Sequence, residues 1–146
     1  MIERALRVNA SSATALYWGA HIHAFSGNSE GATAYADRAL RLSPFDQLAY
    51  EGHQSLGIAA FKDFRYGEAA AHYARAIQAN PGFSMMYFLH AATLAHSGCI
   101  EEAKPLIQRA LELEPTLRAG VMFRLGAEPD IAQRFADGAR LAGMPD

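Results

Sequence analysis

The sequence has a single cysteine and no long apolar segment. Cys99 has no second cysteine in the chain with which to form a disulfide, and one unpaired cysteine suits a reducing compartment. The first residues, Met1–Arg7, are amphipathic and charged, unlike a signal peptide, and no run of 18 apolar residues occurs. These absences favour a cytoplasmic location and give no support for export or for a membrane span.

Charge of either sign is also scarce. Only 19% of the 146 residues are charged and the formal net charge is -2. Neither nucleic acid nor an anionic membrane surface is therefore an expected partner on electrostatic grounds. Apolar residues make up 51% of the chain, a balance typical of a globular domain with one sizeable core.

Motifs of catalysis and of nucleotide binding are absent as well. No P-loop, G-x-G-x-x-G, G-x-S-x-G or C-x-x-C pattern occurs, so we expect no enzymatic activity, no catalytic residue and no cofactor.

The six histidines are the remaining candidates for chemistry. On a helix, His21 and His23 would point about 200° apart, and His90 and His96 would lie about 120° apart, so neither pair suits one shared metal ion. Convergence with a further histidine in the folded chain stays open. A metal-binding or histidine-containing phosphotransfer module is the alternative to the function argued below.

What the chain does contain is a repeated stretch. It occurs as Ala39–Pro44, Ala76–Pro81 and Ala110–Pro115, and once without its proline as Ala5–Ala10, at offsets of 34, 37 and 34 residues. Each copy is an apolar helix end, and the proline that follows cannot continue the helix. A period near 34 indicates one supersecondary unit stacked several times. The predicted fold class is therefore all-α, a solenoid of about three helix-turn-helix repeats plus terminal helices.

The period also predicts the domain organisation. A repeat domain spans 1–118, with a partial repeat at 1–10 and full repeats at about 11–44, 45–81 and 82–115. Capping helices occupy 119–146, and the helix expected at 116–125 can cover the open apolar end of the stack. The expected helices are 12–25 and 29–42, 45–62 and 66–79, 84–97 and 100–113, 116–125 and 131–142. Because residues 2–8 match only the end of a second helix, we expect the chain to be a piece of a longer protein.

The second repeat carries three extra residues. Pro44 and Ala69 are 25 residues apart, whereas Pro81 and Ala103 are 22 apart. Three residues are close to one helical turn, so we expect the first helix of this repeat to be about a turn longer. The connection at 62–65 has no glycine, unlike the other two hairpin turns.

The small residues and prolines carry a family resemblance. The patterns Ala69-X3-Tyr73-X2-Ala76 and Ala103-X6-Ala110-Leu111-X3-Pro115 resemble the tetratricopeptide repeat over about residues 1–118. This resemblance implies a right-handed superhelix whose first helices line a concave groove for a peptide or a partner helix. More narrowly, residues 41–46 and 135–146 resemble the C-terminal repeat region of bacterial signalling proteins, where it follows a class III adenylate cyclase domain or a winged-helix DNA-binding domain.

The resemblance implies a noncatalytic interaction or regulatory domain of a larger bacterial signalling protein. The expected groove residues are Thr14, Tyr17, His21, Phe25, Leu48, Glu51, Ser55, Met85, Phe88, Ala92 and His96. Any of them could instead pack against the neighbouring helix. The stripe has no Lys or Arg to grip a C-terminal carboxylate, which favours an apolar or aromatic ligand. The partner would be a protein, a peptide or another domain of the same polypeptide, and self-association is a further expectation.

Overall fold

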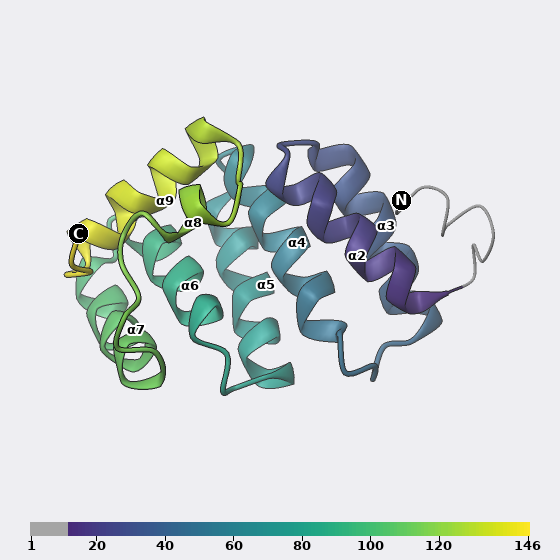
Figure 1. The fold of residues 1–146 in the computed structure, drawn as a ribbon, viewed down its shortest axis with the longest axis horizontal. Coiled ribbons are helices and arrows are strands. Elements are labelled where there is room, and N and C mark those ends of the chain that lie inside the picture. The colour runs from purple at the N-terminus through teal and green to yellow at the C-terminus, as the bar shows by residue number, and fades with distance from the viewer. Residues whose placement is uncertain (1–11) are drawn as a thin grey trace.

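The computed structural model describes residues 12–146, and every regular element in this range is an α-helix (Figure 1). Three helix pairs follow one another: α2 (Ala13–Phe25) with α3 (Ser29–Leu42), α4 (Ala49–Lys62) with α5 (Tyr66–Ala79), and α6 (Ser84–His96) with α7 (Ile100–Leu113). Two further helices end the chain, α8 (Val121–Arg124) and α9 (Pro129–Leu141). The all-α solenoid is confirmed. The partial repeat expected at 1–10 lies outside the described residues.

Alanine lets the helices of the stack approach one another closely. Each return helix carries alanines with no solvent exposure, among them Ala39, Ala76 and Ala110 at the ends of the repeated stretch. Helices α3 and α5 each contact two first helices: α3 lies against α2 and α4, and α5 lies against α4 and α6. Because the same interface recurs, each pair is stabilised mainly by its neighbours.

The helix ends follow the expected signals. The Ser12 hydroxyl accepts a hydrogen bond from the Ala15 amide (3.4 Å), and the Asn28 side chain accepts one from the Gly31 amide (2.9 Å). Gly27 and Gly98 close their hairpins with φ of 85° and 84°, a left-handed conformation that glycine adopts without strain.

The extra residues of the second repeat lie mostly in a loop, so the expected longer helix from Phe45 is wrong. Four residues separate Pro44 from α4, whereas two separate Pro81 from α6, and α4 is only one residue longer than α6. Asp46 explains the difference: one carboxylate oxygen accepts from the Leu48 amide (2.9 Å) and the other from the Ser43 hydroxyl (3.3 Å). These local bonds stabilise a turn where a helix could have begun.

The hairpin turn of the second pair uses a phenylalanine where the others use glycine. Phe64 has φ of 62°, a left-handed conformation that costs a non-glycine residue about 1–2 kcal/mol. The residue is 68% exposed. The turn therefore holds a large aromatic ring at the C-terminal end of α4.

The C-terminal segment folds back along the stack. The expected helix at 116–125 is reduced to the four residues of α8, which packs against α9. Helix α9 runs across the stack along the upper edge of that view and packs chiefly against α6. Helix α9 thus lies across the first helices of the pairs.

No helix of residues 12–146 combines the length and the apolar character that crossing a bilayer requires.

Candidate functional site

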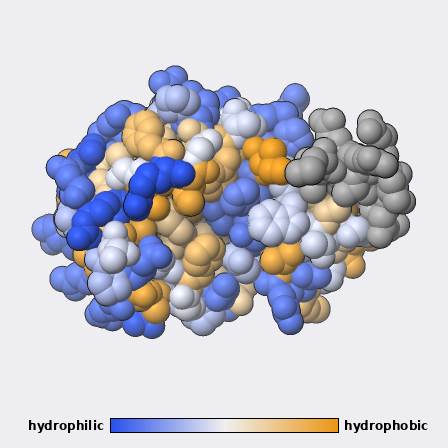
Figure 2. Space-filling model, in the orientation of Figure 1, coloured by the Kyte–Doolittle hydropathy of each residue, from blue (hydrophilic) through white to orange (hydrophobic). Residues whose placement is uncertain are grey.

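The candidate site is the surface formed by the first helices α2, α4 and α6, called here the inner face. The two ends of this face differ. At the α6 end, Met86, Phe88 and Leu89 have no solvent exposure. At the α2 end, Trp18 is 46% exposed and Ile22 is 47% exposed. Figure 2 shows the apolar residues of this side of the molecule as separate patches among hydrophilic ones.

At the α2 end, three aromatic side chains of α2 pack against one another in series. The rings of Trp18 and His21 meet edge to face with centroids 5.9 Å apart, and His21 stacks on Phe25 with centroids 4.2 Å apart. Nδ1 of His21 lies 2.9 Å from a carboxylate oxygen of Glu51 on α4. Glu51 is only 8% exposed, so this contact gives a nearly buried carboxylate its polar partner. Together the rings and the His21–Glu51 pair form a partly apolar surface with one acidic group beneath it.

Helix α9 lies across the C-terminal ends of α2 and α4 and the second half of α6, with most of its contacts on α6. Its N-cap residue Glu128 donates its amide to the carbonyl of Phe25 (2.7 Å) on α2. Phe135 stacks on Phe61 of α4 with ring centroids 3.9 Å apart and planes 12° apart. Gly138 approaches α6 so closely that an added Cβ would lie 2.5 Å from the carbonyl oxygen of Ala92.

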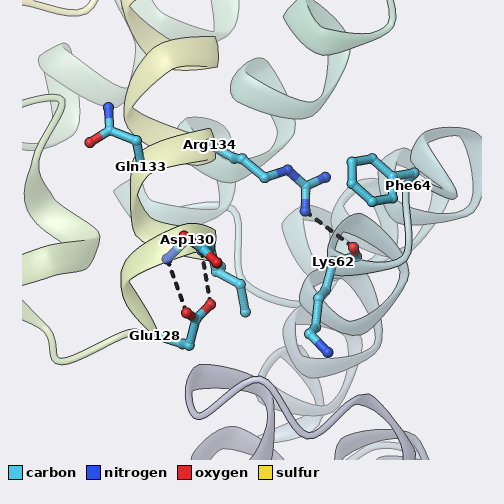
Figure 3. Close-up of a pocket in the computed structure, with 7 residues that line it drawn as sticks. Lys62, Phe64, Glu128, Asp130, Gln133 and Arg134 are labelled. Carbon is cyan, nitrogen blue, oxygen red and sulfur yellow. Dashed lines mark hydrogen bonds between the residues drawn. The ribbon is translucent and has the colours of Figure 1, made fainter.

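Arg134 joins α9 to the C-terminal end of α4 (Figure 3). Its guanidinium donates to the carbonyls of Phe61 (2.6 Å) and Lys62 (3.1 Å) and to the hydroxyl of Tyr66 (3.0 Å). The carbonyls of a last helical turn have no partner within their own helix. Arg134 therefore supplies α4 with a cap from the other end of the chain.

A pocket of about 400 Å³ lies beside this contact, and Figure 3 shows six of its side chains with labels. It is lined by Lys62, Phe64, Glu128, Asp130, Ile131, Gln133 and Arg134. The amides of Asp130 and Ile131 at the start of α9 both donate to the Glu128 carboxylate, at 3.1 and 3.2 Å. Because those amides are occupied and Glu128 is acidic, the helix terminus is not an anion site. The pocket is part of the interface between α4 and α9.

Most of the expected groove residues are packed in the core. Tyr17, Phe25, Ser55, Met85, Phe88 and Ala92 are all buried. Tyr17 donates its hydroxyl to the Ser43 carbonyl (2.9 Å), and burial, with a smaller contribution from Asp46, raises its pKa to about 12. Ser55 donates to the carbonyl of Glu51 (2.8 Å). With the helices packed as in this structure, a ligand on the inner face would not contact these side chains.

The other expected residues are more accessible. Thr14 is exposed, and Leu48, His21 and His96 are partly buried. His96 is engaged by α9, because its Nε2 lies 2.6 Å from the Arg134 carbonyl. Trp18 and Ile22 are not among the groove residues predicted from the sequence. Their four-residue spacing on one side of α2, away from the buried seam of Leu16, Ala20 and Ala24, was the signal available in the sequence.

The histidines do not gather into a recognisable metal site. Residues 12–146 contain no group of three or more His, Cys, Asp or Glu side chains placed to hold a metal ion. The phosphotransfer alternative required a four-helix bundle, and the observed solenoid is a different architecture.

Three histidines make stability sensitive to acid. Burial lowers the pKa of His53, His72 and His90 below the usual value, and the positive charge of Arg75 lowers it further for His53 and His72. The folded chain therefore keeps these rings neutral where the unfolded chain takes up protons, near pH 6.5. The contribution of these neutral rings to the free energy of unfolding is fully present above pH 6.5. It is lost as the pH falls from 6.5 through the lower pKa values of the folded chain, by up to about 1.4 kcal/mol per pH unit for each ring.

Urea unfolding at pH 7.5, 6.5 and 5.5 measures this loss. We expect a flatter dependence when His53 and His90 are both replaced by glutamine, because glutamine does not titrate in this range. NMR titration midpoints at or above 6.5 for the three rings would contradict the prediction.

Comparison with known proteins supports the assignment of the fold. No protein-family model matches the chain. It is 32% identical over 76 residues to Hsp70-Hsp90 organizing protein 3 of Arabidopsis thaliana, in a match that covers 52% of this chain and 14% of that protein. The chain thus spans only a small part of that relative.

Three solved structures share the architecture. A thermophilic TPR protein of Thermus thermophilus is 20% identical with a TM-score of 0.70, covering 97% of this chain and 79% of that one. PilW, a type IV pilus biogenesis factor, is 23% identical with a TM-score of 0.70, covering 97% and 62%. An O-GlcNAc transferase of Thermobaculum terrenum is 27% identical with a TM-score of 0.67, covering 90% and 26%. The fold is that of tetratricopeptide-repeat solenoids, and these likenesses support a tetratricopeptide-repeat protein.

Proposed function

We propose that this chain is a noncatalytic protein-interaction module that binds a peptide or a partner helix on its inner face. The observation that carries the proposal is the exposure of Trp18 and Ile22, at 46% and 47%, beside the His21–Phe25 stack. Tryptophan is enriched among residues that dominate binding energy at interfaces. A large apolar pair exposed on this face gives a partner an anchor.

The ligand we expect is apolar or aromatic. Within α2, α4 and α6 the one Lys or Arg residue is Lys62, at the end of α4. A carboxylate clamp needs several convergent cationic donors, and this face does not offer them. Thr14 and the His21–Glu51 pair lie at the edge of the anchor, where they would contact polar groups of the ligand. Leu48 remains a proposed contact because it is partly buried beside Tyr17.

We further propose that the module belongs to a larger bacterial signalling protein, in the cytoplasm. The support is the likeness of residues 41–46 and 135–146 to the C-terminal repeat region of such proteins. Sequencing the reading frame upstream of Met1 tests this directly: a cyclase or winged-helix domain is the expected result, and an unrelated upstream gene would refute it.

Site-specific photo-crosslinking tests the interaction surface. A photoreactive residue at Trp18 is expected to capture a discrete partner from the native lysate, whereas the same residue at Glu112, exposed on α7, is not. The captured partner should bind the purified chain, and Trp18→Ala should weaken that binding at least about tenfold, because hot-spot truncation costs about 2 kcal/mol or more. Equal capture at both positions would contradict the proposed surface.

A further inference from the structure

Helix α9 lies on the inner face in the way a bound partner helix would. It touches the three first helices through Phe25, Phe61 and Ala92. Its buried side is Ile131, Ala132, Phe135, Ala136, Gly138 and Ala139, and its other side is polar. An amphipathic helix laid in a groove is a recurring mode of recognition between proteins. Here the helix comes from the same chain.

The most specific part of this contact is a cradle for a guanidinium group, formed by Phe61, Lys62, Phe64 and Tyr66. The Arg134 guanidinium carbon lies 4.3 Å from the ring centre of Phe61, 4.2 Å from that of Phe64 and 5.8 Å from that of Tyr66. Two main-chain carbonyls and one hydroxyl accept hydrogen bonds from it. A planar guanidinium suits these in-plane acceptors and stacked rings, and an ammonium does not fit both at once.

The residues around Arg134 add two further requirements. The next residue, Phe135, supplies the ring that stacks on Phe61. The residue four positions after Arg134 is Gly138, where any side chain would meet the carbonyl of Ala92 and the ring of His96. The inner face therefore fits a helix with an arginine, an aromatic residue directly after it, and a glycine four positions after the arginine.

Helices α2 to α7 make contacts with one another that do not involve α9, although α9 shares their buried core. Each hairpin packs against its own partner helix and against the next hairpin, and these contacts do not pass through α9. The segments that join α9 to α7 contain only the single turn of α8, and Gly126 in the second of them has φ of 84°. Release of α9 would uncover an apolar face rather than dismantle the stack.

We propose that α9 occupies in cis a groove whose partner is an amphipathic helix of the same kind, with the Arg-aromatic-x-x-Gly pattern, which binds when it replaces α9. This rests on the proposed interaction function and names the chemistry of the partner. A tethered helix has an effective concentration of the order of millimolar. If α9 itself docks with an intrinsic dissociation constant of about 1 μM, a competing helix binds about a thousandfold more weakly to the closed chain than to the open one.

A labelled peptide of residues 127–146 is the probe for this proposal. It is titrated into three full-length chains: the unaltered chain, Gly138→Val and Asp137→Ala. Valine at 138 prevents α9 from docking but leaves every residue of the groove unchanged, since Gly138 belongs to α9. Asp137 is exposed on the same helix, so its variant is the matched control.

We expect the Gly138→Val chain to bind the peptide at least about 100-fold more tightly than either of the other two chains. A peptide with Arg134→Lys should bind that chain at least about tenfold more weakly than the unaltered peptide, because lysine cannot reproduce the guanidinium contacts. A Gly138→Val chain that keeps its helical hairpins by NMR yet does not bind the peptide would overturn the proposal. Equal affinity for the Arg and Lys peptides would overturn the role of the cradle.

A second variant, Arg134→Ala, opens α9 without adding volume and should give the same order of affinities. If both variants unfold the hairpins, α9 is an integral part of the fold and the proposal is wrong. Light scattering of the unaltered chain tests whether the groove binds a second copy of this chain. A dimer with exchanged α9 helices would show that the partner is a second copy and would refute a foreign helix. None of these results depends on photo-crosslinking at Trp18. The proposal for α9 and the proposed interaction function can therefore be refuted independently.

Discussion

Replacing Phe135 by alanine is expected to lower the free energy of unfolding by about 3–5 kcal/mol, the usual range for removing a fully buried phenylalanine. Phe135 has no solvent exposure and stacks on Phe61, which is equally buried. The change removes the ring-on-ring contact and leaves a cavity between α9 and α4 that the neighbouring rings fill only in part. Urea unfolding followed by circular dichroism measures the loss.

The matched control for this prediction is Asp137→Ala, two residues further along α9. Asp137 is exposed, and within residues 12–146 its hydrogen bonds are to Gln133 and Arg140 of its own helix. Surface pairs of this kind contribute little, so we expect a change within about 0.5 kcal/mol. A loss below about 1 kcal/mol for Phe135→Ala would mean that α9 is not docked on α4 in solution.

The second large effect is expected at Gly57 on α4. A Cβ at this position would lie 2.4 Å from Cε1 of Tyr73, whose ring has no solvent exposure and is enclosed by the core. Overpacking of a core costs about 1–3 kcal/mol, and a contact this short belongs at the upper end. Alanine regains about 1 kcal/mol of helix propensity relative to glycine. We therefore expect Gly57→Ala to destabilise the chain by about 2 kcal/mol, measured by urea unfolding.

Gly19→Ala is a stringent control, because the clash distance is the same. Its Cβ would lie 2.4 Å from the ring of Tyr35, but this ring is only partly buried and can swing outward. The gain in helix propensity then offsets the displacement, and the net change should stay within about 0.5 kcal/mol. Equal losses for the two alanine variants would show that burial of the facing tyrosine is not what decides the outcome.

The sequence by itself determined the hairpins. Helices α3, α5 and α7 begin and end at the residues predicted for them, as 29–42, 66–79 and 100–113. The signals are local: small residues at helical spacing, a proline just beyond the C-terminal end, and, for α3 and α7, a glycine in the turn before the helix. The prediction failed where a local hydrogen bond competed with helix formation. The Asp46 side chain stabilises a turn, so α4 begins four residues later than predicted.

Only the tertiary structure decided what lies on the inner face. The pattern of α9 shows that one side must be buried, but an amphipathic stripe does not specify which surface buries it. That choice depends on contacts between residues about 70 positions apart, such as Arg134 with the last carbonyls of α4, and on the close approach that Gly138 permits. For the same reason the sequence placed Tyr17 and Phe88 in an open groove, whereas packing between neighbouring helices and the returning segment buries them. Local propensity sets where helices begin and end, and long-range packing sets which of their faces remain available to a partner.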